Sequence, residues 1–279
     1  MRIYRESGFT LVEMMAGLVI VLVLTSITFA VTRGAMESGY TARETAAART
    51  LASAYAAATA DNDGVFLPGF DDTASGYTAG GLSIPPEAAH RYPYRLAPYF
   101  DYGLEGVILV NRNKAQIKNS GMDSTYATSL FPALGMNLYY VGGEWENGEL
   151  SMKEDCATRM GQVSKPSSML LFASAGYGAG DKKVDGYNRL EPPNKRVKVW
   201  DSSDTDDDAR DKPPGNYGNI DFRHNGLAVC VFLDGSIRMM APKQLRDMRL
   251  WNRNAQDLDD PDYRVPVETP PPGSGSGRR

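Results

Sequence analysis

The sequence predicts an α+β protein in which one long N-terminal transmembrane helix packs on an antiparallel β-sheet. Three observations predict this class: a charge-free apolar run over residues 14–31, an alanine-rich continuation to residue 60, and turn-separated apolar stretches within residues 217–240. The 279 residues are 42% hydrophobic and 23% charged, which is typical of a globular chain and excludes a wholly disordered or fibrous one. The net charge of −4 offers no basic excess for phosphates, so no nucleic acid is expected as a partner.

The predicted transmembrane helix covers residues 9–32, which reaches the roughly 20 residues that a helix needs to span a bilayer. Arg2 and Arg5 precede this segment, and positive charge before a span places the N-terminus in the cytoplasm. Glu13 does not fit an ordinary span, because a carboxylate deep in a bilayer costs roughly 2.5–3.5 kcal/mol on insertion scales. Either it lies at the headgroup level or it has a positively charged partner.

The residues around this carboxylate carry a resemblance to a known family. Residues 6–13, ESGFTLVE, resemble the signal of type IV prepilins and type II secretion pseudopilins. In that family a short charged leader ends in Gly, a Phe follows, and a Glu is fifth after the cut. The resemblance implies that prepilin peptidase removes residues 1–8 by cleaving between Gly8 and Phe9, and then methylates the new amine. It also implies that this amine meets Glu13 of a neighbouring subunit in a filament. An ordinary secretory signal ending near Ala30 is the alternative.

Residues 33–60 are the predicted soluble continuation of the helix. Alanine is the best helix former, and Ala48, Leu51 and Tyr55 make an apolar face at helical spacing. Gly34 and Gly39 are the expected bend points, and residues 61–64, DNDG, are a stop signal. The resemblance implies that this helix forms the core of a filament, whereas a single membrane anchor with a helical stalk is the alternative.

Residues 61–264 are predicted to form a β-rich globular domain, and residues 265–279 a flexible tail rich in Pro, Gly and Ser. Residues 71–98 are expected to be irregular, and Pro242 to open a short helix that ends at Trp251. Asn225-Gly226 and Asp234-Gly235 indicate tight turns of a β-meander. The expected strands are 105–110, 136–141, 169–173, 217–223, 227–233 and 236–240.

A second resemblance lies in this meander. His224, nine further residues and Asp234-Gly235 are similar to the H-x9-D-G signature of a large bacterial family with prepilin-type leaders. Ser236 stands where many members have His, so a two-histidine site lacks its second imidazole. From the residues alone, a structural role is weighed against a metal or recognition site. In the structural role, His224 bonds a backbone carbonyl and Asp234 shapes its turn.

Residues 201–211 are rich in aspartate, and carboxylate oxygens at short spacing suit Ca²⁺. The resemblance to major pseudopilins, which hold Ca²⁺ before their C-terminus, implies the same ion here. The alternative is a solvated acidic loop. The sequence leaves open whether Cys156 and Cys230 are bridged in an oxidising compartment. The candidate calcium ligands are Asp204, Asp206, Asp207 and Asp208.

These features predict a non-enzymatic protein: a structural subunit or accessory of a type II secretion pseudopilus or type IV pilus-like filament. The expected partners are prepilin peptidase, other pilin-like subunits and an inner-membrane assembly platform. The expected location is the bacterial inner membrane, with one span and with the C-terminal domain in the periplasm or in an envelope filament. The alternative is a membrane-anchored protein that binds an envelope component and never polymerises.

Overall fold

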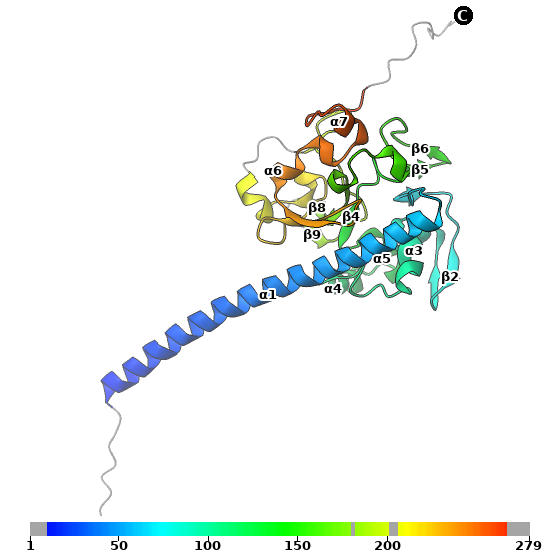
Figure 1. Ribbon diagram of the computed structural model, residues 1–279. Helices are drawn as coiled ribbons and strands as arrows, with labels where there is room; N and C mark the ends of the chain where they lie inside the picture. Colours follow the sequence, from blue (N-terminus) through cyan, green and yellow to red (C-terminus); the bar gives the residue numbers. More distant parts are fainter. Residues whose placement is uncertain (1–9, 180–181, 201–205, 267–279) are drawn as a thin grey trace, which may run out of the picture. The chain divides into compact units, whose positions relative to one another are not determined.

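The computed structural model describes residues 10–179, 182–200 and 206–266 (Figure 1). The chain divides into two compact units, residues 1–42 and 43–279. The helix α1, Leu11–Asp61, contributes to both units, and the rest of the described chain forms helices and mainly antiparallel strands. The predicted α+β class with a long N-terminal helix is therefore confirmed.

Helix α1 is a single element, and both Gly34 and Gly39 lie within it. It ends close to the predicted stop. Gly64 has a φ of +76° and donates its N–H to the carbonyl of Thr59 at 2.8 Å. This left-handed conformation closes a helix and favours glycine, which explains why the chain turns at this position.

The strands of the globular unit fall into four groups among the described residues. A four-stranded antiparallel sheet has the order β11-β10-β7-β4, a three-stranded sheet has the order β1-β5-β6, and two hairpins pair β2 with β3 and β8 with β9. Their bounds are β1 Phe70–Asp71, β2 Tyr77–Ala79, β3 Leu82–Ile84, β4 Leu134–Met136, β5 Glu144–Glu146, β6 Glu149–Leu150, β7 Leu170–Ser174, β8 Gly176–Ala179, β9 Lys182–Asp185, β10 Ala228–Phe232 and β11 Ile237–Met240.

Short helices cover these sheets, and several begin with proline in the first turn, where its missing N–H costs nothing. The α-helices are α2 Pro86–Ala89, α3 Tyr92–Leu96, α4 Asn113–Lys118, α5 Ser124–Leu130, α6 Pro242–Leu245 and α7 Arg253–Asp257. The 3₁₀ turns are η1 Ala97–Phe100, η2 Met160–Gln162, η3 Pro166–Ser168, η4 Asp206–Asp211, η5 Pro214–Tyr217 and η6 Met248–Leu250.

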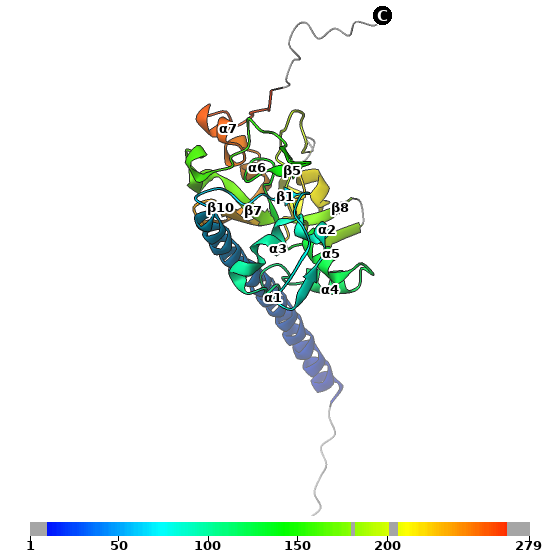
Figure 2. The same ribbon diagram turned by 90° about the vertical axis from the view of Figure 1, so that its right-hand side faces the viewer.

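The main core lies between the C-terminal part of α1 and the four-stranded sheet (Figure 2). Every residue of β7 and β10 is buried, as expected for central strands covered on both faces. Tyr55 of α1 packs edge-on against Phe172 of β7, with ring centroids 5.9 Å apart. The predicted apolar face of the helix, which includes Ala48 and Leu51, is fully buried in this core.

The prediction of a β-meander is confirmed for its second half only. Strands β10 and β11 form the expected hairpin, and Gly235 has the positive φ of +81° that its turn needs. The expected strand 217–223 is wrong, because Gly218 and Asn219 both have positive φ and break extended backbone. The third strand beside β10 is instead β7, which lies more than 50 residues earlier in the sequence and was expected at residues 169–173.

Three further expectations are wrong. Residues 105–110 form turns, because the N–H groups of Ile108 and Leu109 both bond the carbonyl of Leu104. Of the strand expected at 136–141, only Met136 lies in a strand, because β4 ends there. The chain then turns, and the N–H of Val141 bonds the carbonyl of Asn137 at 3.0 Å. The helix expected over 242–251 is divided into α6 and η6, because Asp247 is extended and caps the N–H of Arg249.

The fifth wrong expectation is the irregular chain over 71–98, which contains β2, β3, α2 and α3. Gly80 and Gly81, with φ of +58° and +74°, supply the two-residue turn between β2 and β3. A pair of glycines between short segments is a hairpin signal that the composition of this region obscured.

We expect Leu51→Ala to lower the free energy of unfolding of the globular unit by about 2–5 kcal/mol, because it leaves a cavity under a fully buried side chain. Urea unfolding of the full chain in detergent, followed by tryptophan fluorescence, measures the change. The matched control is Arg49→Ala on the exposed side of the same helix, which should shift the value by less than about 0.5 kcal/mol. Equal effects of the two substitutions would contradict the docking of this face.

Candidate functional site

The predicted site residues lie in three separate parts of the chain. Gly8 and Phe9 are outside the described residues, whereas Glu13 is described and fully exposed near the start of α1. His224 is buried in the globular unit, and Asp234 is exposed at the opposite end of β10. The signature His and Asp therefore flank one strand without forming one site.

Glu13 has a local partner at the beginning of α1. Its carboxylate accepts hydrogen bonds from the N–H of Thr10 at 2.9 Å and from the Thr10 hydroxyl at 2.8 Å. The hydroxyl of Thr10 in turn accepts from the N–H of Glu13 at 3.2 Å. This reciprocal arrangement is a capping box, which satisfies N–H groups that the first helical turn leaves unpaired. The carboxylate thus has a structural role in a single chain, besides any partner in an assembly.

The helix that follows Glu13 is apolar and unburied. One helix of the described chain, α1, is long and apolar enough to cross a membrane, and the most apolar window has a mean hydropathy of 2.5 and no buried residue. Large side chains such as Leu18, Leu22 and Phe29 are each about 60% exposed. An apolar surface of this extent needs lipid or other apolar helices around it.

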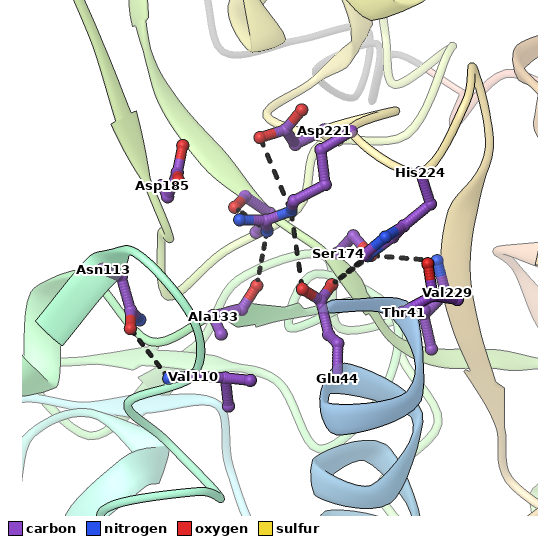
Figure 3. Close-up of polar contacts among 12 residues, drawn as sticks. Thr41, Glu44, Val110, Asn113, Ala133, Ser174, Asp185, Asp221, His224 and Val229 are labelled. Carbon is purple, nitrogen blue, oxygen red and sulfur yellow. Dashed lines mark hydrogen bonds and ion pairs between the residues drawn. The ribbon is translucent and has the colours of Figure 1, made fainter. Parts of the chain in front are cut away.

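A buried charged cluster is the most developed polar site of the globular unit (Figure 3). Glu44 of α1 places one carboxylate oxygen 3.3 Å from Nε2 of His224 and the other 3.6 Å from Nε of Arg223. The hydroxyl of Ser174, at the end of β7, donates to the same carboxylate and accepts the N–H of Val229 at 2.9 Å. The carboxylate is 1% exposed, so its ionic and hydrogen-bonding partners are fixed by the fold.

Arg223 extends this cluster away from α1. Its Nη2 donates to the carbonyls of Ala133 and Ala175 at 2.9 and 2.6 Å. Its Nε lies 3.6 Å from Asp221, whose other oxygen pairs with Nζ of Lys183 at 2.8 Å. The guanidinium therefore joins the C-terminal part of α1 to the edge of the central sheet and to β9.

The turn 224–227 places the two side chains that face Glu44. Asn225 and Gly226 have φ of +54° and +80°, and His224 exchanges two backbone hydrogen bonds with Leu227. This is the tight turn that Asn-Gly predicts. It directs Arg223 and His224 toward Glu44, a partner 180 positions away that sequence spacing did not indicate. The available signal was Glu44 itself, a lone charge one helical turn before Ala48 and two before Leu51 on the apolar face.

The electrostatics of the cluster favour ionised Glu44. Burial raises the pKa of this carboxyl group, but the charge of Arg223 and the hydrogen bonds from His224 and Ser174 outweigh it and hold the pKa below its ordinary value of 4.5. Burial lowers the pKa of Arg223, yet Glu44 and Asp221 together raise it above its ordinary range. Each partner thus keeps the other charged inside the protein.

Asp234 lies in a turn, and the two cysteines lie in the buried interior. The Asp234 carboxylate accepts the N–H of Ser236 at 2.9 Å and so shapes the β10–β11 turn. Cys156 and Cys230 are both buried free thiols. Burial raises the pKa of Cys156 to about 12, which makes it a weak nucleophile at neutral pH.

The calcium prediction falls largely outside the described structure. Asp204 is not among the described residues, and the side chains of Asp206, Asp207 and Asp208 are not described either. Within the described residues, no group of three or more His, Cys, Asp or Glu side chains is placed to hold a metal ion. Calcium binding by this acidic segment stays a prediction.

Comparison with known proteins adds one finding. The model of the prokaryotic N-terminal methylation motif matches residues 3–29, which include Gly8, Phe9 and Glu13. This match indicates a pilin-like protein that prepilin peptidase processes, with pilin-like partners in general. No curated protein and no solved structure gives a match to this chain.

We expect Glu44→Ala to lower the free energy of unfolding by about 3–5 kcal/mol, because it removes a carboxylate that balances the positive charge of the largely buried Arg223 guanidinium. The neighbouring exposed Arg43→Ala should change stability by less than about 0.5 kcal/mol. Urea unfolding of the full chain measures both. A small effect of Glu44→Ala would mean that water reaches the cluster.

The depressed pKa of Glu44 also predicts a pH dependence. A carboxylate whose folded pKa lies below its ordinary value of 4.5 contributes stability above that pH and loses it as the pH falls. We expect the melting temperature of the wild type to fall more steeply between about pH 5 and pH 3 than that of Glu44→Gln. Parallel curves would contradict the ionised state of this group.

Proposed function

We propose that this chain is a structural subunit or accessory of a type II secretion pseudopilus or of a type IV pilus-like filament. The observation that carries the proposal is the match to the prokaryotic N-terminal methylation motif over residues 3–29. The unburied apolar helix that follows supports it, because such a helix can bundle with copies of itself.

In this proposal, prepilin peptidase cleaves after Gly8 and methylates the amine of Phe9. The methylated amine stays positively charged and pairs with Glu13 of a neighbouring subunit in the apolar interior of the filament, where a charge-assisted bond is strong. The N-terminus lies in the cytoplasm, as Arg2 and Arg5 favour, and the globular unit lies in the periplasm or on the filament. An inner-membrane assembly platform adds the subunit.

The cluster around Glu44 has a place in this proposal. A subunit that is extracted from the membrane by its helix needs that helix firmly attached to its globular unit. The contacts of Glu44 with Arg223 and His224 supply such an attachment within the globular unit. The H-x9-D-G signature would then serve the fold, with His224 binding the helix and Asp234 shaping a turn.

A membrane-anchored envelope protein that never polymerises is the second candidate. The capping box favours this second candidate, because Thr10 gives the Glu13 carboxylate hydrogen-bond partners without a second subunit. The two candidates differ in what the charge of Glu13 does, and substitutions at these two residues separate them.

We expect Glu13→Gln to reduce incorporation into filaments about tenfold, because a lost charge-assisted bond is worth about 1.5–3 kcal/mol. Glutamine still completes a capping box, so helix formation and membrane insertion should be retained. The matched variant Thr10→Ala removes the cap and keeps the charge, and should change incorporation by no more than about threefold. Immunoblots of sheared filaments and of membranes measure both.

The reverse pattern, with Glu13→Gln normal and Thr10→Ala defective, would leave Glu13 a capping residue only.

Independently, the mass of the N-terminal peptide from native membranes tests processing. A peptide that starts at methylated Phe9 is expected. A start at Met1 would favour the simple anchor, and a start at Val31 an ordinary secreted protein.

A further inference from the structure

A groove on the globular unit lies next to the free edge of the three-stranded sheet. It has a volume of about 870 Å³, within the range of protein binding sites. Its lining includes the apolar side chains of Val65, Trp145, Leu150 and Cys156 and four charged residues: Glu149, Lys153, Glu154 and Arg159. The groove belongs entirely to residues 43–279 and is remote in sequence from the prepilin motif.

The β5–β6 hairpin carries the edge of this groove. Its pairs are Trp145 with Leu150 and Glu146 with Glu149, and Ser151 donates to the carbonyl of Glu144 at 2.9 Å. Because hydrogen-bonded and non-hydrogen-bonded pairs alternate, the N–H and C=O of Leu150 point away from β5. The outward carbonyl of Trp145, on the other side, is used by the N–H of Asp72 at 3.2 Å.

Leu150 therefore presents one unused donor and one unused acceptor. The strand order β1-β5-β6 leaves β6 at the edge, and within the described residues neither backbone group of Leu150 has a partner. An unpaired edge of this kind is a template for another strand. In Figure 1 the hairpin lies at the periphery of the globular unit, where a second chain can reach it.

The walls of the groove are rigid. At the tip of the hairpin, the N–H of Asn147 bonds both carboxylate oxygens of Asp72 at 2.9 Å. In the lining of the groove, Nε1 of Trp145 donates to the carbonyl of Gly142 at 3.1 Å. Across the groove, the Gln162 side chain accepts the N–H groups of Thr158 and Arg159 at 2.7 and 3.1 Å. A preformed surface binds without a large ordering cost.

The charges of the groove indicate which partner fits. Glu149, Lys153, Glu154 and Arg159 are exposed, and none forms an ion pair with another described residue. Two are acidic and two basic, so the rim has no net charge and offers both signs of charge to a second rim of the same composition. An isologous contact, in which the same patch of two copies meets across a two-fold axis, requires this property.

We propose that two copies of this chain pair through the outer edges of their β6 strands, with Leu150 opposite Leu150 of the second copy. In an antiparallel hydrogen-bonded pair, opposed residues exchange two N–H···O=C bonds. The two-fold axis then leaves no donor or acceptor of Leu150 unused. Pairing buries the apolar side chains that line the two grooves. It also sets the acidic side chains of each rim near the basic ones of the other. The inference does not depend on the proposed function.

Co-purification of two differently tagged full-length copies from solubilised membranes tests the pairing. Both copies carry Glu13→Ala, so that contacts of the N-terminal helices contribute little. We expect Leu150→Pro, which removes the outward N–H and spares the hairpin bonds, to reduce co-purification at least about tenfold. The matched Leu150→Val keeps the N–H and should stay within about twofold. Equal recovery of the two variants would overturn the pairing.

Charge reversal gives a test that does not require a proline to fold. Glu149→Lys gives each rim a surplus of positive charge, and Lys153→Glu a surplus of negative charge. Each variant should pair poorly with itself, at least about fivefold below wild type, and the two should recover pairing when mixed. Unchanged self-pairing, or no recovery in the mixture, would overturn the proposal.

These outcomes separate from those of the proposed function. Normal filaments from a chain that carries Leu150→Pro alone, together with lost co-purification of the copies that carry both Leu150→Pro and Glu13→Ala, would support pairing as a property of the globular unit. An N-terminal peptide starting at Met1 would overturn the filament proposal and leave the pairing test unaffected.

Discussion

The carboxylate of Glu44 is buried where α1 begins to pack on the globular unit, and the packing of the helix depends on it. The apolar face that follows is rich in alanine, whose small side chains bury area without specifying one position. The contacts with Arg223 and His224 are directional, and Ser174 fixes the carboxylate between them. The fold thus combines a non-directional apolar contact with one polar contact that sets its register.

This arrangement makes the charged cluster costly to disturb. Glu44 and Asp221 are 1% and 2% exposed and Arg223 is 15% exposed, so the two carboxylates depend on the guanidinium for their ionised state. Three parts of the chain meet there: α1, the end of β7 and the turn before β10. A change at any of them alters the attachment of the helix. Of the signature residues His224 and Asp234, only His224 belongs to this cluster, and its contact with Glu44 supports the structural role that we propose for it.

The two carboxylates of α1 that stand in apolar surroundings illustrate how environment decides role. Glu13 is exposed, bonds Thr10 of its own first turn among the residues that the structure describes, and is the group that we propose for a partner outside the chain. Glu44 is enclosed by Arg223 and His224 of its own chain. The same residue type therefore serves assembly in one place, as we propose, and internal attachment in the other. The β6 edge adds a third kind of contact, made by backbone groups rather than by charge.

Local patterns let the sequence determine much of this protein. The prepilin-type motif around Gly8 and Glu13, the charge-free run, the alanine-rich helix and the Asp234-Gly235 turn are all encoded by neighbouring residues. Helix and turn formation depend on such neighbours, and the helix and the turn are confirmed by the structure. The roles of Gly8 and Glu13 stay predictions.

Tertiary structure decided the rest. The order β11-β10-β7-β4, the ion pairs of Glu44 and the unpaired edge at Leu150 depend on residues far apart in the chain. The strands expected at 105–110 and 217–223 failed because apolar composition cannot reveal that glycine and asparagine adopt positive φ there. Long-range pairing is set by which surfaces meet in the folded core, and no local pattern records that.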